Sequence, residues 1–398
     1  GLPVPSFAGD WPQILGPDRN GIARGEKLLQ EWPAGGPKVL WKREVGQGYA
    51  GIAVAQSRAA LFHRAEGKEV VECLDASSGK VLWKASFTVT YSGGLSSDSG
   101  PRCVPLIHRD RVIVFGINGS LHCVSFKDGS KHWSRKIARE LRAPEGYFGH
   151  GSTPIAHGDS VILNPGGRPD AGLVAVSLKD GKTIWKSSSE KASYSSPTSA
   201  DFFGKRHVVY LTRLNLVSIN PSTGDVYFRF PFGRLGPTVN AATPVVQNNH
   251  IFVSASYGIG AMCVKVGENN SSVQWENTEM ASQFTTPVFK DGFLYGIDGR
   301  EDVGRARLIC MEMQTGKVKW ARLGFGKASI IRAGDKLLIM KTDGTLVLAE
   351  ASPKGYTEFA SDRVFGSTTF ALPALSDGRL FVRDTRTLKC LAVSKTNR

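Results

Sequence analysis

The sequence predicts an all-β fold, an eight-bladed β-propeller of four-stranded antiparallel blades, and three observations support this prediction. One type of segment occurs eight times along the 398 residues. Successive copies are spaced by roughly 40 to 50 residues, which is the length of a four-stranded blade. The last copy is cut short by the chain end, and its missing half stands near the N-terminus. The two ends of the chain are therefore expected to share one blade.

Each copy contains a small residue, a turn and an aromatic residue, which usually follows the small residue by ten positions. The small residue is Cys73, Cys123, Ala175, Ser218, Cys263, Cys310, Ala349 or Cys390. The first seven copies end in Trp83, Trp133, Trp185, Phe228, Trp275, Trp320 and Phe359. Trp41 lies in a Lys-Val-Leu-Trp run like that of Lys80 to Trp83. We expect the strand near Trp41 to complete the C-terminal blade and close the ring.

The strands and turns follow the same period. Runs such as Arg111 to Phe115 and His250 to Val253 are rich in β-branched and aromatic residues and follow tight turns. Glycines between the third and fourth strands are expected to adopt a positive φ, at Gly79, Gly129, Gly181, Gly224, Gly316 and Gly355. The aromatic residues, Trp41 included, should pack between blades. We expect residues 37–398 to form the propeller and residues 1–36 to form a lead-in segment that packs on it.

The repeat resembles a known motif. The pattern Ala-x-Asp-x-x-Thr-Gly-x-x-x-Trp is the tryptophan-docking motif of pyrroloquinoline-quinone (PQQ) enzyme-like repeats, and the copies ending in Trp83 and Trp320 match it best. The segment Trp11 to Gly21 resembles the lead-in of exported bacterial proteins with such repeats. The scaffold is also similar to that of the outer-membrane assembly lipoproteins of the BamB type. The resemblance implies the propeller fold and a location in the periplasm or outside the cell.

Charge and cysteines narrow the possible partners. The net charge is +15, but the basic residues are dispersed and no nucleic-acid motif accompanies them, so no dedicated nucleic-acid site is expected. No apolar run is long enough to span a membrane, and any signal peptide is taken as removed. Five cysteines occupy the small-residue position, where neighbouring blades lie roughly 10 Å apart, so free buried thiols are expected. A Cys103–Cys123 bridge is the open alternative.

Loops at one end of the ring are the candidate ligand site. In the PQQ enzymes such loops hold the quinone and a calcium ion over a central funnel. The candidate funnel residues are His63, Arg64, His150, Arg168, Asp170, Arg213, Tyr257, Asp298, Arg300 and Asp384. We hypothesise a cationic funnel that accepts an anionic group, because arginine side chains match carboxylates and phosphates. The alternative is that these polar loop residues only meet water.

Evidence for catalysis is thin. The chain lacks the adjacent cysteine pair of the alcohol-oxidising enzymes, and it has no hydrolase, phosphate-loop or zinc-protease motif. The loop with Asp298, Glu301 and Asp302 is the only one rich enough in carboxylates to bind calcium, and a salt-bridged surface loop explains it more simply. We therefore assign no catalytic residue and no metal ligand.

The sequence thus favours a non-catalytic, monomeric binding or scaffold protein of the cell envelope, with a protein or cell-wall polymer as partner and no cofactor. A PQQ- and calcium-dependent dehydrogenase of alcohols or sugars is one alternative. A glycan-binding module is another.

Overall fold

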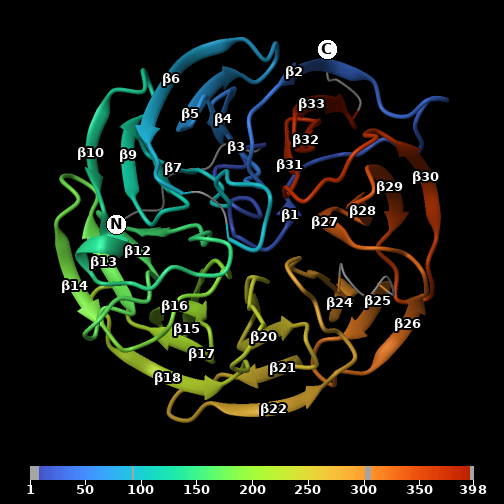
Figure 1. The fold of residues 1–398 in the computed structure, drawn as a ribbon. Helices are drawn as coiled ribbons and strands as arrows, with labels where there is room; N and C mark the ends of the chain where they lie inside the picture. Colours follow the sequence, from blue (N-terminus) through green and yellow to red (C-terminus); the bar gives the residue numbers. More distant parts are fainter. Residues whose placement is uncertain (1–8, 92–93, 301–305, 395–398) are drawn as a thin grey trace.

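The chain forms a closed ring of eight β-sheets around a central axis (Figure 1). The computed structural model describes residues 9–91, 94–300 and 306–394. The blades are numbered here in chain order, and each has four antiparallel strands. The predicted all-β, eight-bladed propeller is therefore confirmed.

The strands have the following bounds. Blade 1 contains β3 (Ile52–Ala55), β4 (Arg58–Ala65), β5 (Lys68–Asp75) and β6 (Val81–Thr88); blade 2 contains β7 (Leu106–His108), β8 (Arg111–Phe115), β9 (Leu121–Ser125) and β10 (Lys131–Arg135). Blade 3 contains β11 (Ile155–His157), β12 (Ser160–Leu163), β13 (Leu173–Ser177) and β14 (Thr183–Ser187); blade 4 contains β15 (Thr198–Phe202), β16 (Lys205–Leu211), β17 (Asn215–Ile219) and β18 (Val226–Pro231). Blade 5 contains β19 (Val245–Gln247), β20 (His250–Ala255), β21 (Gly260–Lys265) and β22 (Ser272–Asn277); blade 6 contains β23 (Val288–Lys290), β24 (Phe293–Asp298), β25 (Arg307–Glu312) and β26 (Val318–Arg322). Blade 7 contains β27 (Ala328–Ala333), β28 (Lys336–Lys341), β29 (Thr345–Glu350) and β30 (Glu358–Arg363); blade 8 contains β31 (Ala374–Ser376), β32 (Arg379–Arg383), β33 (Thr387–Ala392) and β2 (Val39–Glu44).

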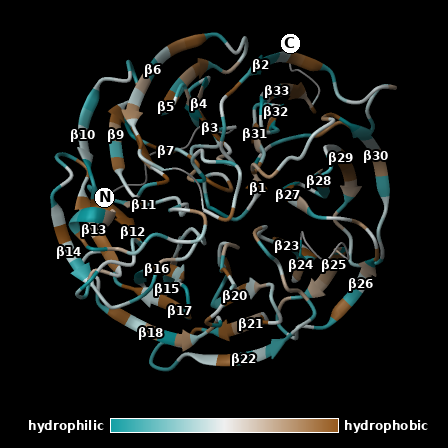
Figure 2. Ribbon diagram, viewed as in Figure 1, coloured by the Kyte–Doolittle hydropathy of each residue, from teal (hydrophilic) through white to brown (hydrophobic). Residues whose placement is uncertain are grey.

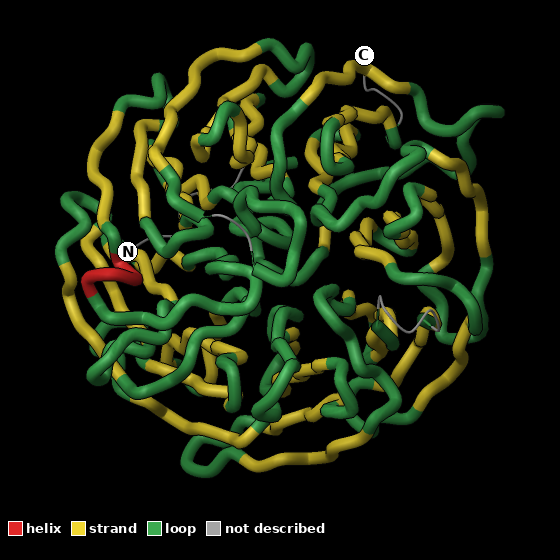
Figure 3. The backbone as a smooth tube through the Cα atoms, in the orientation of Figure 1, coloured by secondary structure: helices red, strands yellow, loops and turns green. Residues whose placement is uncertain are grey.

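Strand order fixes two faces of the ring. In each blade the first strand is innermost and the fourth is outermost (Figure 3). Because the strands are antiparallel, connections between blades and connections from second to third strand share one rim, which we call the funnel face. The first-to-second and third-to-fourth turns share the opposite rim, the turn face. Hydrophobic residues concentrate on the strands, and the apolar core lies between the faces of neighbouring sheets (Figure 2).

The ring closes as predicted. β2 pairs antiparallel with β33, and Trp41 stands opposite Cys390 in this pairing. The N-terminal strand therefore supplies the outermost strand of blade 8. All six cysteines are free and buried, so the expectation of free thiols is met and Cys103 is not in a disulfide.

Six tryptophans attach one blade to the next, at six of the eight junctions of the ring. Each indole N–H donates a hydrogen bond of 2.9 to 3.1 Å to a backbone carbonyl on the following blade; the pairs are Trp41–Ala76, Trp83–Phe126, Trp133–Leu178, Trp185–Pro221, Trp275–Met313 and Trp320–Ser352. In the first five pairs the indole ring also covers the turn glycine three residues further along. A Cβ atom added to Gly181 would stand 2.8 Å from the Trp133 ring. Glycine is needed there for this close approach as well as for its φ of +73°.

Two copies carry phenylalanine in place of tryptophan, at Phe228 and Phe359. Phe228 faces blade 5, where that connection is two residues longer. Phe359 precedes blade 8, whose third and fourth strands, β33 and β2, are not joined by a turn. The prediction of a docking ring at Phe359 is wrong by one position. Ala349 pairs with Glu358, so Phe359 is the unpaired residue of a β-bulge, and its side chain is 39% exposed. Ala360 takes the inward position opposite Leu348.

Gly355 also differs from the sequence expectation. It lacks the positive φ of its equivalents, and nothing lies within 4 Å of a Cβ added there. The turn of blade 7 contains two more residues before its closing hydrogen bond, from the Glu350 N–H to the Thr357 carbonyl, than the turn of blade 1, from the Asp75 N–H to the Lys80 carbonyl. The two extra residues lengthen the turn, and Gly355 does not take the left-handed conformation of its equivalents.

The segment before β2 enters the ring from the turn face. Trp11 is buried and exchanges backbone hydrogen bonds with Val54 at the end of an innermost strand. The chain then reaches its deepest point at Arg19 and returns as β1 (Ile22–Ala23), which pairs in parallel with β27. Leu29 then bonds to the Val393 carbonyl in blade 8. In Figure 1 this segment, in blue, crosses the middle of the ring.

Arg19 holds the deepest part of this segment. It is 2% exposed, and its guanidinium donates to the carbonyls of Thr153, Pro154 and Pro197 at the funnel-face ends of blades 3 and 4. Its Nε donates to the Gln13 side chain at 2.7 Å. Burial lowers the pKa of Arg19. Since the partners are carbonyl dipoles, the segment is fixed by charge-assisted hydrogen bonds across two blades.

Substitution at Gly181 tests the docking contact. We expect Gly181→Ala to destabilise the protein by roughly 2 to 5 kcal/mol, because it adds overpacking against Trp133 to the cost of a left-handed alanine. Gly158→Ala in the same blade is the matched control, since Gly158 has a φ of +56° but nothing within 4 Å of an added Cβ. It should cost only about 1 kcal/mol. Equal shifts of the two urea midpoints would disprove the contact.

Substitution at Arg19 tests the central segment. Arg19→Met keeps much of the volume but leaves three buried carbonyls without donors, and we expect a loss on the order of 3 kcal/mol or more. Thermal denaturation and limited proteolysis of residues 9–32 are the measurements. Arg24→Met on the same segment is the control, because Arg24 is exposed and pairs only with Asp18. A variant of Arg19 as stable and protease-resistant as that control would rule out this role.

Candidate functional site

Three long connections form much of the funnel face. They join blade 1 to blade 2 (89–105), blade 2 to blade 3 (136–154) and blade 4 to blade 5 (232–244). The second of them contains α1 (Ile137–Glu140). Across the described ranges, no helix has the length and apolar character needed to cross a membrane. Figure 3 shows these loops, in green, converging over the ring.

Each of the three connections exposes one large apolar side chain. The exposed fractions are 73% for Leu95, 45% for Tyr147 and 64% for Leu235. These residues lie together, because the Leu95 N–H donates to the Tyr147 carbonyl at 3.2 Å and the Tyr147 hydroxyl donates to the Gly236 carbonyl at 3.3 Å. We call Leu95, Tyr147 and Leu235 the loop patch. Exposed apolar groups that gather on a soluble protein commonly mark a protein-binding surface.

The loop patch rests on an ordered base. Arg213 donates to the carbonyls of Arg234 and Gly236, and Tyr194 accepts the Phe148 N–H at 2.7 Å. The buried carboxylate of Glu190 also stabilises blade 4. It accepts hydrogen bonds from Thr212, Asn215 and Arg229, and its position links the blade 3 to blade 4 connection to three elements of blade 4. The loops are thus held by direct hydrogen bonds across blades.

The surroundings of the loop patch are basic. Arg142, Arg168 and Arg234 are exposed on the same connections or next to them, and Arg213 is half-buried. Arg168 is tied to this region because its backbone N–H donates to the Leu141 carbonyl at 2.7 Å. Glu145 is an exposed acidic group in this region. The funnel face therefore offers apolar side chains within a largely cationic border.

Two of the ten predicted funnel residues are buried. His63 is 3% exposed, and its Nδ1 accepts the Gly46 N–H at 2.7 Å. His150 is 6% exposed, and burial lowers its pKa to about 4. Its ring packs against Phe115 with centroids 5.2 Å apart. Neither imidazole is placed to bind an anion from solvent, so the hypothesis of a cationic funnel does not hold at these two positions.

Three further predicted residues serve the loops themselves. Arg64 donates to the carbonyls of Tyr91 and Ser99. Arg213 holds the blade 4 to blade 5 connection, as described above. Asp384 accepts the N–H groups of Arg386 and Thr387 in its own turn.

The other five lie in separate places on the funnel face. Arg300 stacks over the Tyr257 ring at 4.5 Å, and Tyr257 accepts a hydrogen bond from Gln283. Arg168 and Asp170 are exposed on the blade 3 loop. The two oxygens of Asp298 accept hydrogen bonds from the Ala281 N–H and from Arg307. The structure therefore distributes the ten residues around the rim and does not bring them into one cluster.

The calcium hypothesis meets a specific obstacle at Asp298. Calcium needs about six to eight oxygen ligands, whereas both Asp298 oxygens already have backbone or guanidinium donors. Glu301 and Asp302, the other two members of the predicted cluster, lie outside the described residues. Asp298 in this conformation does not fit a calcium–quinone site.

Sequence reasoning missed an arc of aromatic rings on the axis side of the funnel face. Tyr49 and Phe370 are in edge contact with centroids 4.9 Å apart, and Phe370 also contacts Phe284 at 5.8 Å. Arg102 stacks over Tyr49 at 4.4 Å and forms an ion pair with Asp98. Each ring stands three or four residues before an innermost strand. That spacing was the available signal, since it directs the side chains towards the axis.

A buried glutamate connects blade 1 to the loops of the patch. Glu69 is 1% exposed and accepts the Ile117 N–H at 2.7 Å. The Ile117 carbonyl in turn accepts the His150 N–H, in the connection that carries Tyr147. Burial raises the pKa of Glu69 to about 7, against the opposing effects of the Ile117 N–H and nearby Arg64. This carboxyl group is therefore protonated in the folded protein at mildly acidic pH.

These features define the class of the protein. The docked tryptophans and the closed eight-bladed ring make it a propeller of PQQ-like repeats. A family model described as outer membrane protein assembly factor BamB matches residues 33–193 and 67–322. The chain belongs to this family, as the sequence resemblance indicated.

Individual relatives are distant. The chain is 25% identical over 181 residues to the outer membrane protein assembly factor BamB of Burkholderia pseudomallei, covering 37% of this chain and 45% of that protein. It is 21% identical over 311 residues to the BamB of Shewanella oneidensis, covering 76% of this chain and 66% of that protein. The matches thus span less than two thirds of the length of either relative.

Solved structures show the same fold. BamB from Moraxella catarrhalis superposes with a TM-score of 0.65 at 13% identity, covering 89% of this chain and 97% of that one. The quinohemoprotein alcohol dehydrogenase of Comamonas testosteroni gives a TM-score of 0.74 at 11% identity, covering 99% of this chain and 82% of that one. Since one propeller carries both assembly factors and dehydrogenases, the fold alone does not decide the function.

The protonation of Glu69 predicts a pH dependence. Its pKa of about 7 in the folded chain lies above the ordinary 4.5, so its stabilising contribution is complete below about pH 4.5 and is lost as the pH rises through 7. We expect Glu69→Gln to remove this loss, so that the variant gains on the order of 2 to 3 kcal/mol relative to wild type between pH 4.5 and 8. Urea denaturation across that range measures it. Glu268→Gln at an exposed turn is the control, and a flat difference for Glu69→Gln would contradict the burial argument.

Proposed function

We propose that this protein is a non-catalytic scaffold of the bacterial cell envelope that binds a protein partner in outer-membrane protein assembly. Membership of the BamB family supports the process, because the relatives are named for it. The observation that carries a binding role is the loop patch, where Leu95, Tyr147 and Leu235 are exposed together on hydrogen-bonded loops. A periplasmic location follows from the same proposal.

The chemistry of the surface defines the partner. Aromatic and aliphatic groups at the centre of an interface supply most of the binding energy, and surrounding charges mainly set orientation and association rate. The arginines around the loop patch favour a partner with an apolar groove and an acidic border. Because the loops are already tied together, little ordering free energy is lost on binding.

Crosslinking tests the proposal in cells. A photoreactive phenylalanine analogue replaces Tyr147 in the full-length protein, expressed in its source bacterium, and crosslinked products are identified by mass spectrometry. We expect a subunit of the outer-membrane assembly machinery as the main product. Adding Leu95→Glu and Leu235→Glu should abolish it, because both charges would have to be buried in the interface.

Leu323→Glu is the matched control, since Leu323 is 73% exposed on the funnel face but lies outside the loop patch. This control should crosslink normally and restore the amount of folded outer-membrane β-barrels in a strain lacking the gene. The proposal is wrong if the loop-patch variant restores these β-barrels as well as the control does, or if no assembly subunit is crosslinked.

A further inference from the structure

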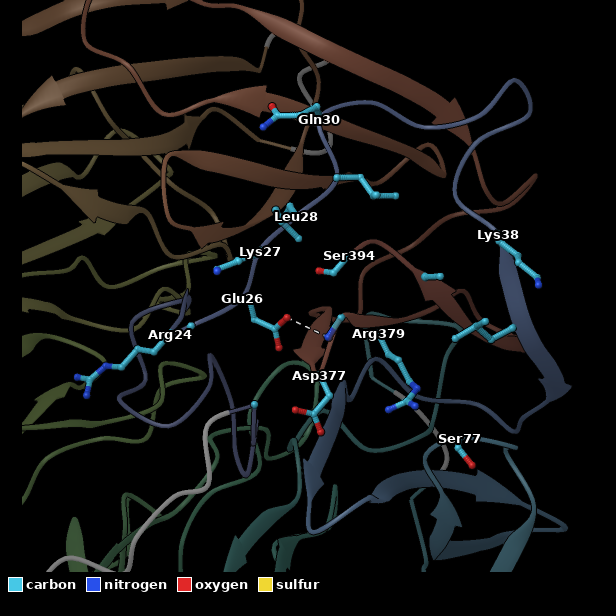
Figure 4. A pocket seen from close by; sticks show the side chains of 16 residues that line it. Arg24, Glu26, Lys27, Leu28, Gln30, Lys38, Ser77, Asp377, Arg379 and Ser394 are labelled. Carbon is cyan, nitrogen blue, oxygen red and sulfur yellow. Dashed lines mark hydrogen bonds between the residues drawn. The ribbon is translucent and has the colours of Figure 1, made fainter. Parts of the chain in front are cut away.

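A second candidate site lies on the turn face of blade 8. A cavity of about 1090 Å³ opens there between the N-terminal segment, the β31–β32 turn and the start of β2 (Figure 4). Gly378 in that turn donates its N–H to the Glu26 carboxylate and so fixes the segment as one wall. The volume is at the upper end of the usual range for small-molecule sites, so it can admit more than a single ion.

Three cations of the cavity have no ion-pair partner within the described chain. They are Lys27, Lys38 and Arg379, and Figure 4 shows Arg379 reaching into the space between the β31–β32 turn and Ser77. The fourth cation, Arg24, pairs with Asp18 at 2.5 Å. The acidic groups of the lining are Glu26, which has a backbone donor, and the exposed Asp377. The lining therefore holds more cationic than acidic side chains, although Arg379 lies near enough to Glu26 to favour its charged form.

An apolar strip continues from the cavity onto the side of the ring. Leu40 lines the cavity and is 40% exposed, and Val39 beside it is 44% exposed. Val81 and Leu82 hold the same positions on the outermost strand of blade 1 and are 40% and 48% exposed. Docking of Trp41 onto the turn at Gly79 brings the starts of β2 and β6 together. We call Val39, Leu40, Val81 and Leu82 the apolar strip.

We propose that the cavity and the apolar strip together bind an extended acidic peptide segment. In an extended chain, successive side chains point in opposite directions. Carboxylates on one side of the peptide would face Lys38 and Arg379, and apolar side chains on the other would cover Leu40 and Leu82. This site is on the opposite face from the loop patch and is independent of the proposed assembly role.

Fluorescence anisotropy with a defined peptide tests this proposal. The probe is a short fluorescein-labelled peptide of alternating glutamate and leucine, titrated with the full chain at low salt. Lys38→Gln with Arg379→Gln should weaken binding about tenfold or more, since two charge-assisted contacts are lost. Leu40→Ser with Leu82→Ser should weaken it severalfold. Asp377→Asn should tighten it severalfold, because it removes a like charge beside the peptide.

Matched controls make the result specific. Lys205→Gln with Arg206→Gln removes the same charge from the turn face of blade 4, across the ring, and should leave binding unchanged. The loop-patch variant should also bind the peptide normally, which separates this test from that of the assembly role. Thermal denaturation checks that every variant is folded.

Three outcomes would overturn the proposal. Equal weakening by the blade 4 control pair would show attraction to net charge alone. Equal affinity for a lysine–leucine peptide would show that the cations do not select the ligand. Full competition by inorganic phosphate, with no effect of the leucine variants, would assign the cavity to a small anion.

Discussion

The contact between an indole ring and a turn glycine is the interaction on which this ring depends. Flat sheets packed around an axis leave gaps near their outer edges, and six tryptophans fill such gaps while their N–H groups bond to the next blade. Each tryptophan lies in the outermost strand of one blade, and its acceptor belongs to the following third-to-fourth turn. The contact therefore sets the spacing and rotation between neighbouring blades, and the core between them follows from it. At some contacts a second donor two residues further along, such as Arg135 bonding to the Gly181 carbonyl, repeats the link.

The N-terminal segment adds a different constraint. Arg19 draws the chain towards the funnel face from inside the ring, and its carbonyl partners belong to two adjacent blades. The aromatic arc of Tyr49, Phe370 and Phe284 occupies the axis side of the same funnel face. Surfaces available for recognition consequently lie away from the axis, on the loops of the funnel face and on the turn face where it meets the outer wall. Both candidate sites described above are of this kind.

The fold could be predicted from the sequence because repetition multiplies a weak signal. One segment with a small residue, a glycine and a tryptophan is weak evidence, but eight at blade spacing leave few alternative folds. The Trp41 run identifies the closing strand from the sequence alone. The error at Phe359 arose where the repeat is degenerate: two extra turn residues place the paired positions at Leu348 and Ala360, and a sequence pattern alone does not locate a bulge.

The candidate site was much less predictable. The position of the ten candidate residues in loops between strands was enough to predict that they lie on the funnel face. The burial of each side chain, however, depends on how loops from different blades cross. His63 and His150 became structural for this reason. Leu95, Tyr147 and Leu235 are far apart in sequence and none has a motif, so their proximity arises only from hydrogen bonds between loops. Arg19 looked like an ordinary surface arginine, and only the three-dimensional path of the segment shows its carbonyl partners.

The pairing of β2 with β33 has a consequence for biogenesis. The strand that closes the ring is synthesised before blades 1 to 7, and its partner is synthesised after them. Blades 1 to 7 can form one after another as the chain lengthens, but β2 must wait, with its tryptophan undocked on one side, until the final repeat has emerged. A ribosome that stops before β33 would therefore release an open arc with two unprotected sheet edges, which is the form most exposed to proteases and aggregation.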